Sequence, residues 1–405
     1  MIMKNIFYSI LVLLTLTVVL TSCSKDGFDD MQDDTAQIDT NVYYEIKSDT
    51  AVKVVDLMNQ ITLPEGGMVS MDIIENQIKM RELMLQSKIG KDNVQIGLRK
   101  VVYHYNSVDV QGEPITLSAA AFMPGYFDKN VWYDMELDNI CLMEHYTITS
   151  NAESPSMCFP LEIFITNNTL VLMPDYIGYG VTKNMLHPYL NHELCAINSV
   201  DAFPAGYAVF KNLSAKGLKS DWKLYVTGAS QGAGNALAVH KYLDTHSDIA
   251  RNWKFAATNC SSGPYSPIKT MEKYFADGKT ALPVVFPLTL KSMLASYPEL
   301  MDGFSEEMMC SNTYLEVKNQ IDEMISSKQY TTAEINLFFM ENVKKTFADG
   351  LADDEILLVD ILSDDMLNPH SDIMKALNNC FDNNDLIKGW TPVHPIKMHY
   401  STGDR

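Results

Sequence analysis

The spacing of apolar residues in the first two thirds of the chain predicts strands that alternate with helices. Two β-rich runs, 101–105 and 115–123, flank a turn that contains Gly112, which predicts an antiparallel pair. Four further apolar runs of strand length follow, and segments of helical periodicity separate them. These four predicted strands are 140–144, 169–173, 222–227 and 254–258.

The segments between these strands predict crossover helices. They cover 159–165, 193–213 with a bend near Pro204, and 231–243. Upstream, residues 69–85 carry apolar positions at helical spacing and predict a helix beside the sheet. Strands that alternate with crossover helices predict an α/β fold, with a mostly parallel sheet covered by helices on both faces.

Residues 266–389 follow a different pattern, in which helices rich in Met and in acidic residues replace the strands. The segment is too long for a crossover and too apolar for a linker, so it predicts an inserted helical cap. A final strand-like run, 395–400, returns to the sheet. We therefore expect a core formed by 42–265 and 390–405, with the cap between these two parts.

The N-terminus has the layout of a signal peptide. Lys4 precedes an apolar run at 6–20, and small residues lead to Cys23. The sequence Leu-Thr-Ser-Cys resembles a bacterial lipobox, and the resemblance implies a signal peptide over 1–23 and a lipidated Cys23 that anchors the protein in the cell envelope. A simple membrane anchor or secretory signal is the alternative. The acidic segment 24–41 predicts a solvated tether, and it also resembles the export signals of surface-exposed lipoproteins.

Composition narrows the classes of partner and cofactor. The chain has 405 residues and a formal net charge of −20, which argues against DNA or RNA as a partner, since phosphate binding needs a basic face. Seven cysteines are too few for a disulfide scaffold in a chain of this length. The sequence contains no C-x-x-C and no metal-ligand spacing, so we expect neither a metal nor another cofactor.

One motif predicts chemistry. Gly228, Ser230 and Gly232 form a G-x-S-x-G between the predicted strand 222–227 and the predicted helix 231–243. A nucleophilic serine needs such a tight strand-to-helix turn, where glycines remove the Cβ atoms that would collide. The helix N-terminus adds positive potential beside a developing oxyanion. An ordinary helix start with a serine N-cap is the alternative interpretation.

In this context the chain from about Val101 onward resembles the α/β-hydrolase fold, and within it the bacterial lipase-like and secretory-lipase-like esterases. Asp175, Tyr176, Gly178 and Gly180 are similar to the D-Y-x-G-x-G loop of these enzymes, and His187 begins an H-P-Y sequence that often comes next. The resemblance implies a serine carboxylic-ester hydrolase that forms an acyl-enzyme at Ser230. It also implies that His187 and His192 are not the catalytic base.

The resemblance also assigns the oxyanion hole. One N–H donor belongs to Gln231, the residue after the nucleophile, and the second belongs to the loop after the strand 140–144. There His145 and Tyr146 stand where relatives often carry His-Gly-Thr, so Tyr146 replaces the glycine. Either the His145 amide or the Tyr146 amide is the second donor, and the His145 side chain is either a strut or a direct participant.

The acid and the base follow the serine in this fold. The run 395–400 leads into Ser-Thr-Gly-Asp, which resembles the turn after the seventh strand and assigns Asp404 as the acid. We expect the catalytic histidine to be encoded beyond residue 405. Alternatively, 355–360 is the seventh strand, with the acid and the base chosen from Asp360, Asp364, Asp365, His370, His394 and His399.

Three functions are compatible with these residues. The first is a lipid-anchored serine esterase whose substrate is a small-molecule or acylated ester and whose cap shapes the pocket. The second is a surface-anchored binding protein that keeps the fold without catalysis, for which the departure at Tyr146 is mild support. The third is a serine peptidase on the same fold, although no residue specifies a site for a peptide amine.

Overall fold

The computed structural model describes residues 37–58, 71–160, 162–163 and 168–400. Cys23 and Asp404, the predicted lipidation site and the predicted acid, lie outside the described residues. Within the described ranges no helix is both long enough and apolar enough to cross a membrane.

A nine-stranded sheet forms the centre of the molecule, in the order β1-β2-β3-β6-β5-β7-β8-β11, with β4 added beside β3. Its strands are β1 (Tyr44–Lys53), β2 (Val94–Val108), β3 (Pro114–Asp128), β4 (Val131–Asp134), β5 (Asn139–Glu144), β6 (Thr169–Pro174), β7 (Leu224–Ala229), β8 (Phe255–Ser261) and β11 (Ile396–His399). The predicted antiparallel pair is confirmed as β2 and β3, and β6, β5, β7, β8 and β11 run parallel to one another.

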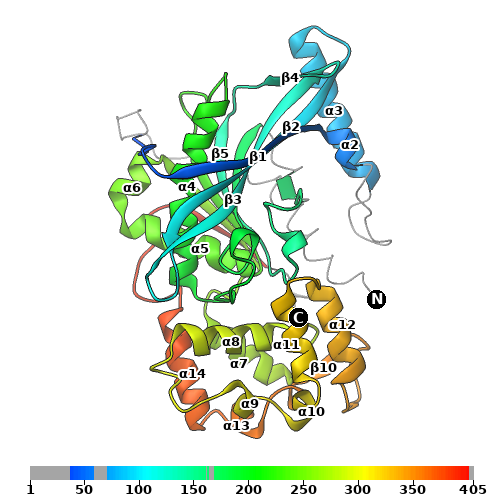
Figure 1. The fold of residues 1–405 in the computed structure, drawn as a ribbon, viewed down its shortest axis with the longest axis vertical. Helices are drawn as coiled ribbons and strands as arrows, with labels where there is room; N and C mark the ends of the chain where they lie inside the picture. The colour runs from blue at the N-terminus through cyan, green and yellow to red at the C-terminus, as the bar shows by residue number, and fades with distance from the viewer. Residues whose placement is uncertain (1–36, 59–70, 161, 164–167, 401–405) are drawn as a thin grey trace.

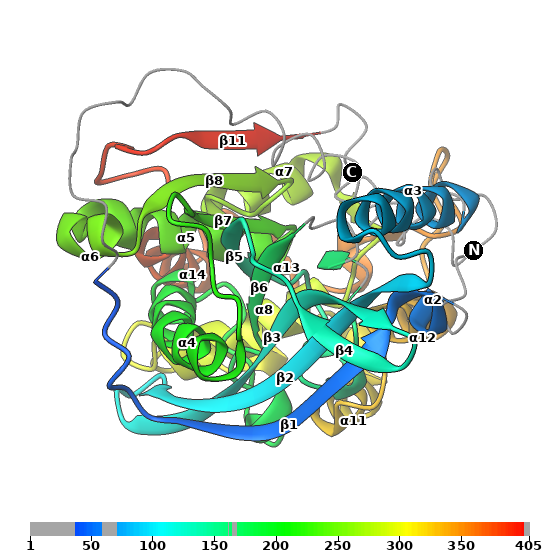
Figure 2. The same cartoon turned by 90° about the horizontal axis from the view of Figure 1, so that it is seen from above.

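Helices cover both faces of the sheet, as the sequence predicts. On β6, Leu170 and Leu172 join the cluster packed under α4 (His192–Leu213) and α5 (Gln231–Thr245). Val171 and Met173 point to the opposite face, with residues of α2 (Val54–Met58) and α3 (Met71–Ile89). Figure 2 shows these two helix pairs on opposite sides of the sheet. A strand whose alternate residues are all apolar is therefore buried on both faces.

The segment 266–389 contains most of the remaining helices. It carries α7 (Pro267–Asp277), α8 (Val285–Ser296), α9 (Glu306–Met309), α10 (Asn312–Leu315), α11 (Lys318–Ser327), α12 (Thr332–Asn342), α13 (Asp364–Leu367) and α14 (Asp372–Asn383). A short ribbon of β9 (Lys279–Thr280) and β10 (Ile356–Leu357) joins them. Figure 1 shows these helices gathered below the sheet. They enclose a hydrophobic cluster of their own, to which the core contributes Tyr189 and Leu190.

Three elements differ from the sequence-based expectations. The strand β1 is not predicted, because it is a mostly exposed, polar edge strand in which apolar alternation is limited to Tyr44 and Ile46. In the described part of 159–165 there is a 3-10 turn at 162–163, closed by a bond from Ile163 N–H to the Pro160 carbonyl. The alternative seventh strand at 355–360 is wrong, because its residues pair with β9 outside the main sheet.

Candidate active site

Ser230 occupies a sharp turn between a strand and a helix. The strand β7 ends at Ala229, the helix α5 begins at Gln231, and Ser230 between them has φ 52° and ψ −124°. Residues with a side chain rarely adopt a positive φ, and such strain persists only where the surrounding structure holds it. The Ser230 N–H donates to the Ser261 carbonyl of β8 (2.9 Å), and the Ser230 carbonyl accepts from Ala233 (3.0 Å). The backbone on both sides of the serine is therefore fixed.

The two glycines of the motif allow β7, β5 and α5 to approach one another. A Cβ atom on Gly228 would overlap the Gly232 carbonyl and would lie 2.9 Å from the Ala233 nitrogen. A Cβ atom on Gly232 would overlap the Glu144 carbonyl and would lie 2.7 Å from the His145 carbonyl oxygen. Both positions therefore require glycine because a Cβ atom would collide with the backbone, as the motif predicts.

The loop after β5 lies next to this turn, because β5 pairs with β7 and Glu144 aligns with Gly228. It brings His145 and Tyr146 to the same edge of the sheet as Ser230. The His145 ring is buried, with Nδ1 2.7 Å from the Tyr146 carbonyl and Nε2 3.2 Å from the Asp175 carbonyl. Burial lowers the pKa of His145 to about 4, so the ring is neutral at neutral pH. These contacts describe a strut within the loop.

The Gln231 side chain is held by a second buried histidine. Its Nε2 lies 2.6 Å from His187 Nε2, and His187 Nδ1 lies 2.8 Å from the Ile177 carbonyl. Burial, followed by the positive charge of Lys328, lowers the pKa of His187 to about 3. The neutral ring then donates from Nδ1 to the carbonyl and accepts from the Gln231 amide at Nε2. Sequence reasoning places His187 in a loop but does not find this role, because the two residues are 44 positions apart.

The fold of this chain is similar to that of known hydrolases, although its sequence is not. No protein-family model and no curated protein matches the sequence. The rice cell wall degrading esterase LipA from Xanthomonas oryzae superposes with a TM-score of 0.59 at 19% identity, covering 89% of this chain and 83% of LipA. A Legionella pneumophila protein assigned as a hydrolase gives 0.59 at 18% identity, with the same coverage. This chain has the α/β-hydrolase fold.

Within the α/β-hydrolase fold, Ser230 occupies the elbow at the carboxyl end of β7, near the middle of the sheet. Ligand sites of open α/β sheets lie at the carboxyl ends of the strands, where the strand order reverses. Here β5 lies between β6 and β7, so the reversal places the loop after β5 and the elbow side by side. The strand β11, which precedes the predicted acid Asp404, pairs in parallel with β8. The strand order from the loop after β5 to this edge of the sheet is therefore β5, β7, β8, β11.

No hydrogen bond from any described residue reaches the Ser230 hydroxyl. His192 is buried, with Nδ1 2.8 Å from the Asn384 carbonyl, and it does not contact the serine. Of the alternative bases, His394 precedes β11, with Nδ1 2.5 Å from Asp244 Oδ1, and His370 is exposed in the turn before α14. His399 is on β11, where it aligns with Ser261 of β8. Among the described residues, the structure therefore brings no histidine side chain into hydrogen-bonding contact with the Ser230 hydroxyl.

Glu144 is a buried carboxyl group directly behind the elbow. It ends β5, and its Oε2 accepts a hydrogen bond from the Ser199 hydroxyl of α4 (3.0 Å). Its Oε1 has no hydrogen-bond partner in the described structure. Burial raises the pKa of Glu144 to about 7, although hydrogen bonds from Tyr176 and Ser199 oppose the shift. No local sequence pattern marks Glu144 as a titratable group near the site, because its burial depends on the packing of β5 against α4.

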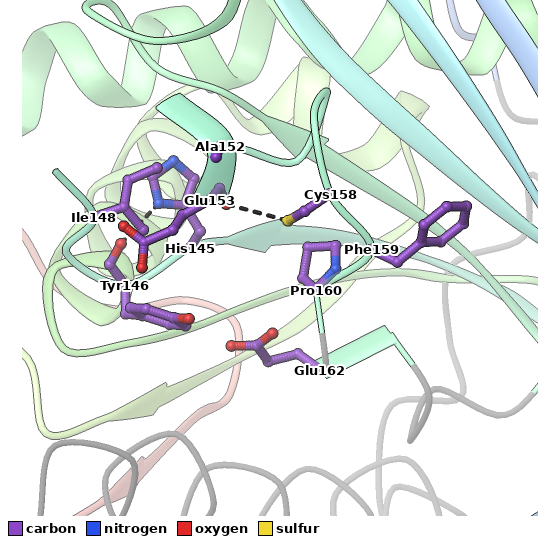
Figure 3. A pocket seen from close by; sticks show the side chains of 9 residues that line it. All are labelled: His145, Tyr146, Ile148, Ala152, Glu153, Cys158, Phe159, Pro160 and Glu162. Atoms are coloured by element: carbon purple, nitrogen blue, oxygen red, sulfur yellow. Dashed lines mark hydrogen bonds between the residues drawn. The ribbon is translucent and has the colours of Figure 1, made fainter. Parts of the chain in front are cut away.

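A cavity of about 210 Å³ borders the loop after β5. Figure 3 shows the loop residues His145, Tyr146 and Ile148 on one side of the cavity and Cys158, Pro160 and Glu162 on the other. Its wall combines apolar and acidic side chains, namely His145, Tyr146, Ile148, Ala152, Glu153, Cys158, Phe159, Pro160 and Glu162. The mixture suits a ligand with both carbon surface and hydrogen-bond donors.

The six described cysteines are free thiols, and five of them are buried. Burial raises the pKa of the thiols of Cys141 and Cys195, which are both fully buried. In the described ranges no group of three or more His, Cys, Asp or Glu side chains is arranged to hold a metal ion.

Proposed function

We propose that the protein is a serine hydrolase that cleaves carboxylic esters through an acyl-enzyme at Ser230. The observation that supports this most is the strained backbone of Ser230 between β7 and α5, in a chain with the α/β-hydrolase fold. An ordinary N-cap serine needs no positive φ, because N-cap residues adopt extended backbone angles. The names of the similar structures, an esterase and a hydrolase, support the same class of reaction.

In the proposed reaction the Ser230 Oγ attacks the ester carbonyl carbon, and the carbonyl oxygen becomes an oxyanion. The Gln231 N–H, at the start of α5, and the N–H of His145 or Tyr146 donate hydrogen bonds to that oxyanion. The base takes the hydroxyl proton of Ser230 during the attack and donates it to the alcohol as the ester C–O bond breaks. Water, deprotonated by the same base, then attacks the acyl-enzyme, and the proton returns to Ser230 as the acid leaves. Asp404 orients the base in this proposal. His145, His187 and His192 are not the base, because each is buried and hydrogen-bonded elsewhere.

A fluorophosphonate probe tests the nucleophile, because it reacts with activated serines and not with ordinary ones. We expect labelling of the folded full-length natural protein at Ser230, located by mass spectrometry of its peptides. The Ser230→Ala variant should lose the label, and the Ser261→Ala variant, altered on the neighbouring strand, should keep it. A well-folded natural protein that takes no label would refute the esterase.

That negative result would favour the second candidate, a binding protein on a hydrolase fold. Two observations support it: Tyr146 stands where the motif expects glycine, and no described histidine contacts Ser230. A positive result leaves the substrate open. The description of LipA as cell wall degrading makes acylated plant polysaccharides the first panel to test, beside short-chain esters and lipids.

We also propose that Cys23 is lipidated and holds the enzyme in the cell envelope. The apolar run 6–20 and the lipobox-like sequence before Cys23 support this location. Growth with an alkyne-tagged fatty acid should tag the natural protein, and the Cys23→Ala variant should remain untagged. A tag that persists in Cys23→Ala would contradict the proposal.

A further inference from the structure

Lys328 is a buried lysine in the turn that joins α11 to α12. The residue is 6% exposed, and its backbone is left-handed with φ 57°. Its Nζ lies over the Tyr179 ring, 4.5 Å from the centroid. In the described part of the chain no carboxylate pairs with this ammonium group. Lys328 Nζ is not one of the fully buried polar atoms without a hydrogen-bond partner, so part of this nitrogen borders accessible space.

Other buried lysines of the protein have oxygen partners. Lys100 donates to the Cys158 carbonyl (2.6 Å), and Lys318 pairs with Glu306 and Asp322. An aromatic face stabilises a cation by about 0.5 to 2 kcal/mol, which is less than the free energy of burying an unpaired charge. An anion that reaches the ammonium group would therefore stabilise Lys328 in this position.

Contacts of Lys328 link the helical segment to the candidate active site. Tyr179 lies 5.2 Å from the His187 ring, and His187 holds the Gln231 side chain. The Lys328 carbonyl accepts from the Asn151 N–H (2.8 Å), in the loop that follows β5. Its positive charge also contributes to the lowered pKa of His187. Tyr179 and His187 thus form a continuous series of contacts from Lys328 to the residue that follows the nucleophile.

We propose that Lys328 is a specificity residue whose ammonium group binds a carboxylate carried by the ester substrate, apart from the scissile carbonyl. This inference rests on the proposed ester hydrolysis for its substrate, whereas the anion site itself does not depend on turnover. Either an acyl group derived from a dicarboxylic acid or an alcohol that is a uronic acid presents this chemistry. At neutral pH Lys328 is mostly protonated, since burial lowers its pKa only to about 8.

A matched pair of substrates tests the site. The 4-nitrophenyl monoester of adipic acid carries a free distal carboxylate, and its methyl-capped analogue is neutral. We expect the natural protein to show a KM about tenfold lower for the free carboxylate, as for a hydrogen bond to a charged group. The Lys328→Met variant should lose this preference and keep its kcat on the capped ester. Acetylated galacturonate against acetylated galactose tests a carboxylate on the alcohol side.

Two variants control for charge and folding. Lys344→Met removes a lysine from the same helical segment and should keep the preference, and Lys328→Arg should keep most of it. Thermal unfolding checks that Lys328→Met is folded. Equal KM values for the two adipate esters and the two sugar esters in the natural protein would overturn the proposal. An equal fall in kcat on charged and neutral esters in Lys328→Met would also overturn it, since that result indicates a general catalytic or structural role.

A binding measurement separates this inference from the proposed function. Monomethyl adipate and dimethyl adipate are titrated by calorimetry into the Ser230→Ala protein, with and without Lys328→Met. If the natural protein hydrolyses no ester but monomethyl adipate binds about tenfold more weakly after Lys328→Met, ester hydrolysis fails and the anion site stands. If Lys328→Met leaves the affinity of monomethyl adipate unchanged, the anion site fails whatever the activity.

Discussion

At the scale of single residues, the backbone of Ser230 is strained. This strain serves a function only if Ser230 is the nucleophile. Its φ of 52° and ψ of −124° belong to a region that glycine adopts freely. We predict that Ser230→Gly raises the free energy of unfolding by about 1 kcal/mol, because glycine removes the strain. Ser230→Ala keeps the Cβ atom and should leave stability nearly unchanged. Urea unfolding of the two variants checks this, and equal stability of both would mean that the turn is not strained.

Glu144 predicts a dependence of stability on pH. Its pKa is raised from 4.5 to about 7 in the folded protein, so the folded state binds its proton more tightly than the unfolded state does. The stability from this group is present at low pH and is lost as the pH rises from about 4.5 through 7. Glu144→Gln has no such loss, so its stability relative to the natural protein should increase over that window by up to about 3 kcal/mol.

Denaturant unfolding at several pH values measures this difference. The exposed Glu113 provides the matched control, because Glu113→Gln should shift stability by a similar small amount at every pH. A Glu144→Gln difference that is constant from pH 4 to 8 would show that the buried carboxyl does not change its ionisation in this range. The measurement does not depend on activity, so it tests the described site even in a protein without turnover.

At the scale of elements, the elbow requires that α5 packs directly on the ends of β5 and β7. A methyl group on Gly232 would overlap the Glu144 carbonyl, which is backbone and cannot rotate away. We predict that Gly232→Ala lowers the free energy of unfolding by about 3 kcal/mol, as overpacking in a core does. Gly217→Ala is the control, since that glycine has a positive φ but open space around it, and it should lose only about 1 kcal/mol. Similar losses would contradict the close packing.

The sequence predicts those elements whose own residues show an apolar pattern or a turn motif. The strand β7 and the helix α5 follow from apolar runs and a glycine-rich turn, because burial on two faces leaves a continuous apolar pattern. The strand β1 escapes prediction, because an edge strand gains its hydrogen bonds from β2 rather than from apolar burial. The segment 159–165 has helical spacing, yet Pro160 and the tie from Lys100 to the Cys158 carbonyl favour a turn in its described part.

At the scale of the whole molecule, the contacts that complete the candidate site join distant parts of the chain. Ser230, Gln231 and the loop of His145 are predictable, because each belongs to a motif with a local pattern. The hydrogen bond between Gln231 and His187 and the approach of Lys328 to Tyr179 are not predictable, because they depend on how separate elements pack. Single-sequence patterns carry no information on which buried polar groups will meet.

The last prediction concerns how the helical segment meets the core. The turn between α11 and α12 docks on the loop after β5: Thr149 Oγ1 donates to the Tyr330 carbonyl (2.8 Å), and Thr332 Oγ1 donates to the Thr147 carbonyl (3.3 Å). Thr149 is fully buried, so Thr149→Val removes one of these bonds with little change in shape and leaves an acceptor unpaired. We predict that this docking weakens by about 1 kcal/mol.

Hydrogen exchange followed by mass spectrometry measures that change locally. Amides of 328–332 and 147–151 should exchange several-fold faster in Thr149→Val, while those of β7 and α5 stay protected, because local opening need not involve the central sheet. Thr245→Val, which removes an exposed hydroxyl at the end of α5, should leave both segments unchanged. If β7 and α5 also lose protection in Thr149→Val, the two hydrophobic clusters unfold as one unit. The helical segment could then not open over Ser230 independently of the sheet.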